Sequence, residues 1–151
     1  MRDTITNLKF EDREYRIHTF TAFEGAGVFL FVTQKIVPLL NALNIGMDGL
    51  LDMERDDVLP TLAKLIGPVL NSIKKEELVE FMKGCLGQVE VLMPAGYMKV
   101  FSGDTFVDEE IEHSLKTCFV LCFHAIKPLL QDFFGEINLT SILNQASNTN
   151  Q

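Results

Sequence analysis

Two cysteines and a histidine near the C-terminal end come closest to a reactive cluster. Cys118 and Cys122 are four residues apart, so a helix would place both thiols on one face, as a zinc site requires. His124 would point roughly 160° away from Cys122, because each helical residue turns the chain by about 100°. The 3 cysteines form no Cys-x-x-Cys pair. We therefore interpret these cysteines as small apolar residues of a core helix and expect no metal site.

Carboxylates are the second candidate chemistry. The acidic run over residues 48–57 lacks the ligand spacing, central glycine and terminal glutamate of a calcium-binding EF-hand loop. Residues 108–110 are acidic too, at the predicted start of a helix, where negative charge is favourable. A nucleophile elbow is absent, and Gly25-Ala26-Gly27 lacks the rest of a phosphate-binding loop. We predict that the protein is not an enzyme and has no catalytic residue and no cofactor.

The composition is apolar and acidic at once. Hydrophobic residues make up 47% of the 151 residues, with 12 Phe and 6 Met, yet the net charge is −8. Negative charge favours solubility and disfavours binding to nucleic acids and anionic membranes. We therefore expect a homo-oligomer or a protein with an apolar client. An odd number of cysteines and the lack of an apolar signal core in residues 1–6 indicate a reducing cytosol.

Periodicity predicts the elements that would position these side chains. Apolar and polar residues alternate over 8–10 and 15–17, which indicates a β-hairpin across a charged turn. Apolar residues spaced by three and four predict helices over residues 21–43, 55–70, 75–86 and 105–134. Residues 89–93 and 97–101 form a candidate short second β element.

From these elements we expect a mainly α fold, a compact helical domain with a small N-terminal β-hairpin. It would occupy residues 1–143 as a single domain, and a polar, flexible tail would follow over residues 144–151.

The predicted last helix is apolar on most of its circumference, so it must be buried by its own fold or by a partner. Four of its phenylalanines are our candidate partner-binding residues: Phe119, Phe123, Phe133 and Phe134. Phe133 and Phe134 point about 100° apart, so one is expected to pack inward while the other contacts a partner. The alternative is that this aromatic stripe is simply core.

The organisation as a whole resembles the tail assembly chaperones of long-tailed bacteriophages. The similar features lie between residues 6 and 134: the hairpin with Tyr15-Arg16-Ile17, the helix containing residues 65–70, the connection through residues 106–109, and the helix ending in Asp132-Phe133-Phe134-Gly135.

The resemblance implies a small, mostly helical protein of the host bacterial cytoplasm that is absent from the mature virion. It would coat the tape measure protein, which is long, helical and apolar and would aggregate before the tail tube closes round it. It would also recruit tail tube subunits.

Two other classes of function remain open for this sequence. A small acidic helical chaperone or regulatory binding module for a secreted effector would share the same composition. A metal-dependent enzyme would depend on Cys118, Cys122 and His124 alone.

Overall fold

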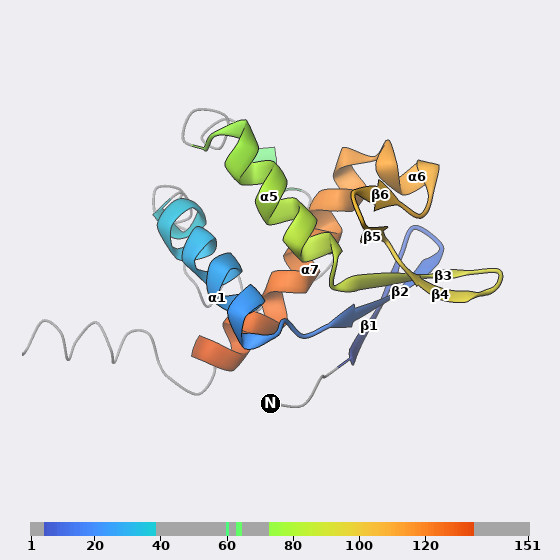
Figure 1. The fold of residues 1–151 in the computed structure, drawn as a ribbon, viewed down its shortest axis with the longest axis horizontal. Coiled ribbons are helices and arrows are strands. Elements are labelled where there is room, and N and C mark those ends of the chain that lie inside the picture. The colour runs from blue at the N-terminus through green and yellow to red at the C-terminus, as the bar shows by residue number, and fades with distance from the viewer. Residues whose placement is uncertain (1–4, 39–59, 61–62, 65–72, 135–151) are drawn as a thin grey trace, which may run out of the picture.

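A computed structural model describes residues 5–38, 60, 63–64 and 73–134 (Figure 1). The elements are, in chain order, β1 (Ile5–Phe10), β2 (Arg13–His18), α1 (Ala22–Phe31), the π-helical segment η1 (Val32–Ile36), α5 (Lys75–Leu86), β3 (Val89–Met93), β4 (Gly96–Lys99), β5 (Phe101–Ser102), β6 (Thr105–Phe106), α6 (Glu109–Glu112) and α7 (Leu115–Phe134). Most of the predicted helix over 55–70 and the tail over 144–151 lie outside the described residues.

The fold is mixed α/β, so the expectation of a mainly α domain is wrong. Four antiparallel strands form one sheet in the order β1-β2-β3-β4, and β5 and β6 form a second, two-stranded sheet. The predicted hairpin and the second β element both exist, but they belong to one sheet because β2 pairs with β3. Tyr15 lies opposite Val91 and Ile17 opposite Val89, across a gap that contains α1 and α5. Periodicity within one segment carries no information about such a distant pairing.

The hairpin turn explains how a charged sequence without glycine joins β1 to β2. Glu11 and Asp12 both have positive φ, 47° and 63°, as the central residues of a type I′ turn do. This turn matches the right-handed twist of the strands. The register then places Leu8, Tyr15 and Val91 in one row, on the side of the sheet that faces the helices.

The last helix begins at Leu115, ten residues later than predicted. Gly103 and Asp104 both take positive φ, which turns the chain and pairs β5 with β6 before α6. Ser114 then starts α7, because its Oγ accepts a hydrogen bond from the backbone N–H of Thr117 at 3.2 Å. The expectation of one helix over 105–134 is therefore wrong in its first third.

The core surrounds α7. This helix contacts α1, α5, α6 and β2, and its residues Val120 and Leu121 are fully buried. In Figure 1, α1 and α5 lie side by side over one stretch of α7, and the four-stranded sheet lies at the other end of the molecule. No helix in the described part of the chain is long and apolar enough to span a bilayer.

Arg13 joins the hairpin to the start of α6 through ion pairs with Asp108 and, at 3.6 Å, with the exposed Glu110. The Arg13 Nη1 donates a hydrogen bond to the Asp108 carboxylate, which also accepts one from the Glu110 N–H at 3.4 Å. The hydrogen bond from Arg13 holds the pKa of Asp108 below its ordinary value of 3.8. A lowered folded-state pKa adds stability above the pKa of the unfolded chain, and this contribution is lost as the pH falls through the folded value.

We expect Asp108→Asn to lower the free energy of unfolding by about 1 to 2 kcal/mol at neutral pH, because it removes one charge of a partly buried pair. Urea denaturation over a pH series measures the difference in the free energy of unfolding between the variant and the wild type. This difference should disappear well below pH 3.8, where the wild-type carboxyl is protonated as well.

Glu109→Gln is the matched control, since it removes the same charge from the same end of α6 at an exposed position. Equal losses from the two variants, or a deficit of Asp108→Asn that persists in acid, would contradict the role of the Arg13 pair.

Candidate binding groove

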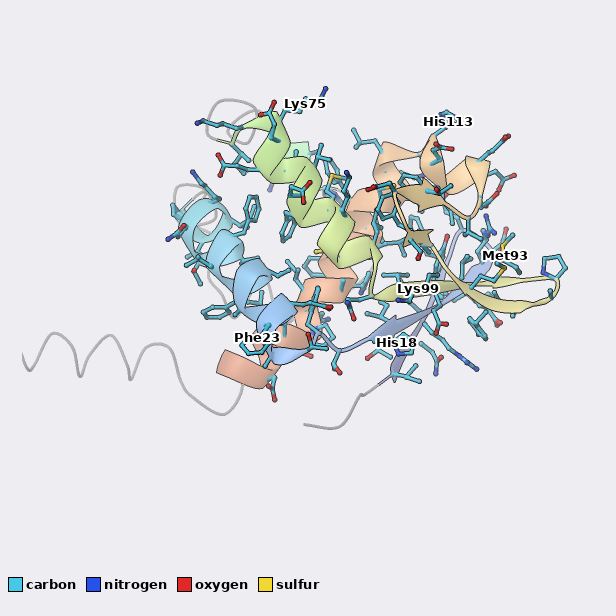
Figure 2. All side chains as sticks on the ribbon, viewed as in Figure 1. His18, Phe23, Lys75, Met93, Lys99 and His113 are labelled. Atoms are coloured by element: carbon cyan, nitrogen blue, oxygen red, sulfur yellow. The ribbon has the colours of Figure 1, made fainter. Side chains whose placement is uncertain are left out.

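An open groove of about 760 Å³ lies between α1 and α5, and residues of β4 and β5 complete its lining. Five phenylalanines are among its lining residues: Phe20, Phe23, Phe31, Phe81 and Phe101. Phe23 is 94% exposed, which is unusual for so large an apolar side chain. Figure 2 shows it on α1, away from the four-stranded sheet. We refer to this feature as the α1–α5 groove.

Local contacts hold the two walls of the groove at a fixed separation. Thr21 caps α1, because its Oγ1 accepts a hydrogen bond from the Glu24 N–H at 3.4 Å. Farther along, the ring of Phe31 stacks on the ring of Phe81 of α5, with centroids 4.4 Å apart and an interplanar angle of 20°. Behind the groove, a Cβ on Gly25 would lie only 3.3 Å from Leu129 Cδ1, so glycine lets α1 pack closely on α7.

Charged groups of both signs border this apolar surface. Glu24, Glu77 and Glu80 line the helical walls, together with Lys83, while Lys99 comes from β4. A concave apolar surface with charges at its border is typical of a site for an amphipathic helix, whose apolar face enters the groove while its polar face stays in water.

A family model described as phage tail assembly chaperone protein, TAC, matches residues 11–142. The chain belongs to the phage tail assembly chaperones. Neither a curated protein nor a solved structure matches it. The matched range contains every described element from β2 to α7, so the whole α1–α5 groove lies within the part of this chaperone that the family shares.

The structure describes the side chains of two of the four predicted partner-binding residues, Phe119 and Phe123. Phe123 is only 7% exposed and belongs to the core, while Phe119 is partly buried on the same helix. Neither residue lines the α1–α5 groove. The side chains of Phe133 and Phe134 lie outside the described part of the structure, so their contact with a partner stays a prediction.

Sequence reasoning missed the groove because its phenylalanines come from different segments. Phe81 and Phe101 are single aromatic residues in α5 and β5, and neither belongs to an aromatic stripe. Phe23 is the groove residue that the sequence could have pointed to. It lies in the first turn of α1, ahead of the buried residues Gly25 and Val28.

The cysteines of this chaperone are structural side chains. Burial raises the pKa of Cys118 to about 11, and its thiol lies 3.4 Å from the carbonyl oxygen of Ile111. A hydrogen bond with Cys85 and burial both raise the pKa of Cys122. Thiols held protonated in this way are poor nucleophiles and poor metal ligands at neutral pH.

We expect the three native thiols to react slowly with a disulfide reagent in the folded protein, because all three are buried and the pKa of Cys118 is about 11. The measurement is the rate of modification, with and without denaturant. The exposed position of Asn7 in β1 provides the control, since an Asn7→Cys variant should gain one rapidly reacting thiol. Rapid modification of the folded wild type at the rate of that added thiol would contradict this assignment.

Proposed function

We propose that this chaperone coats the tape measure protein by binding its apolar helical segments in the α1–α5 groove, and that it recruits tail tube subunits to the coated protein. Its action is non-enzymatic, it takes place in the host bacterial cytoplasm, and the chaperone is absent from the mature virion. The observation that carries the proposal is an exposed aromatic groove within the region that matches the chaperone family.

The shape of the groove suits such a client. A helix laid along the groove, over the stacked rings of Phe31 and Phe81, would contact both α1 and α5, and its apolar stripe could also meet Phe23. A volume of about 760 Å³ holds several large side chains. Burial of apolar surface contributes about 25 cal/mol per Å², which favours the bound helix over a free helix exposed to water.

Recruitment of a second protein needs a second surface, and the outer face of the sheet provides one. Arg16, Glu90 and Lys99 lie in one row across β2, β3 and β4 and alternate in charge. The Arg16 guanidinium also lies 3.7 Å from the centroid of the Tyr97 ring, which fixes its position. We assign contact with tail tube subunits to this charged face because Arg16 and Glu90 lie outside the lining of the apolar groove, which the row reaches at Lys99.

Gly84 of α5 allows the groove to be blocked without disturbing the core. A Cβ at this position would lie 3.8 Å from Val28 Cγ2, which is an ordinary contact, and Gly84 is exposed, so a larger side chain can extend from that Cβ toward solvent. We expect Gly84→Phe to fill the groove and to weaken binding of a helical tape measure fragment by at least about tenfold, which corresponds to ~1.4 kcal/mol. Calorimetric titration with the fragment from the same phage measures the effect.

Gly84→Ala is the matched control. It makes the same backbone change, should raise the free energy of unfolding by about 0.5 to 1 kcal/mol, and leaves the groove open. Binding should therefore match the wild type. Undiminished binding by a folded Gly84→Phe variant would place the tape measure protein on another surface.

A further inference from the structure

The side of α1 that faces solvent is unusually apolar for an exposed helix. Phe23 is 94% exposed and Leu30 is 54% exposed, and the exposed residues Ala26 and Gly27 lie between them. We call these four residues the outer face of α1. A helix that is apolar on all sides is normally covered on all sides.

The two charged side chains of α1 and η1 do not disturb this surface, because both are directed toward α5 and its end. The Oε2 of Glu24 accepts a hydrogen bond from Gln88 Nε2 at 2.8 Å. The Nζ of Lys35 lies 3.6 Å from a carboxylate oxygen of Glu77. The outer face of α1 therefore carries no charge of its own, on a chain whose net charge is −8.

The order of side chains on this face is nearly symmetrical. Phe23 and Leu30 are seven residues apart, so they lie about two helical turns, or ~10.5 Å, from each other on the same side of α1. Ala26 and Gly27 occupy the midpoint. A Cβ placed on Gly27 would meet no heavy atom of the described residues within 4 Å, so a second backbone could approach closely there.

We propose that the outer face of α1 is the interface of a two-fold symmetrical dimer of this chain, with the two copies of α1 packed antiparallel. An axis that passes between Ala26 and Gly27 places Phe23 of each copy against Leu30 of the other, with the small residues in contact at the centre. The inference rests on the geometry of α1. Phe23 and Gly27 also line the α1–α5 groove, whereas Ala26 and Leu30 do not, so a client in the groove and a second copy would share one edge of this face.

A second copy fits this face better than a client does. Two chains of charge −8 repel each other over most of their surfaces, and an uncharged patch lets them meet without opposing carboxylates. The order of large residues at both ends and small residues in the middle lets two antiparallel copies of α1 fit together. A client helix would not require this symmetry. One helix face is smaller than the roughly 1,200 to 2,000 Å² of a stable interface, so the dimer is expected to dissociate on dilution.

Charge substitutions test both the face and the direction of packing. Sedimentation equilibrium over a concentration series should show a reversible dimer of the wild type. Leu30→Glu and Phe23→Lys should each raise the dissociation constant at least about tenfold. The double variant should recover dimerisation, because each introduced lysine then faces an introduced glutamate of the other copy. A wild type that is monomeric throughout, or a double variant that associates no better than the single ones, would overturn the proposal.

Leu115→Glu is the matched control, since Leu115 is also an exposed leucine, at 63%, and begins a different helix. It should dimerise like the wild type, and so should Gly84→Phe, which leaves the outer face of α1 unchanged.

Leu30→Glu should still bind the tape measure fragment, because Leu30 does not line the groove. If Leu30→Glu instead keeps the dimer and loses the fragment, the outer face of α1 is a client surface and the dimer proposal is wrong.

Discussion

Burial of α7 determines how the other elements of this protein are arranged. Val120 and Leu121 are fully buried from solvent. Cys118, Cys122 and Phe123 point in other directions from the helix and are almost fully buried. A helix this apolar has to be covered on several sides, and no single element can do that. The helices α1 and α5 cover one stretch of α7, and α6 and β2 contact it farther along. The four-stranded sheet exists in this form because β2 and β3 together present Tyr15, Ile17, Val89 and Val91 to that core.

This arrangement leaves α1 as an apolar helix that is only partly covered. Val28 and Val32 face the core, but Phe23 and Leu30 do not, and the groove toward α5 remains open beside them. An exposed apolar surface normally carries a risk of aggregation. Here the exposed surface has two parts that share Phe23 and Gly27, a groove that suits a client helix and a nearly symmetrical outer face that suits a second copy. The acidic surface of this chaperone limits uncontrolled association.

Local features of the fold could be predicted from the sequence, and distant pairings could not. The helix over 75–86 has the predicted bounds, and the hairpin has the predicted strands, because periodicity within one segment reports its own buried face. The pairing of Tyr15 with Val91 joins segments that are far apart in the chain, so the sheet was missed. The helix break before Leu115 depends on the positive φ of Gly103 and Asp104 and on the cap by Ser114, which apolar periodicity does not report. The groove was missed for the same reason as the sheet, since Phe31 and Phe81 meet only in three dimensions.

Hydrogen–deuterium exchange of the chaperone with and without a helical tape measure fragment tests the central claim most directly, because it reports every described segment at once. Binding in the α1–α5 groove predicts slower exchange of backbone amides in residues 20–31 and 77–88, and unchanged exchange in β1, at the far edge of the sheet. Slower exchange in the sheet alone, with α1 and α5 unaffected, would contradict the assignment of the groove as the site that holds the tape measure protein.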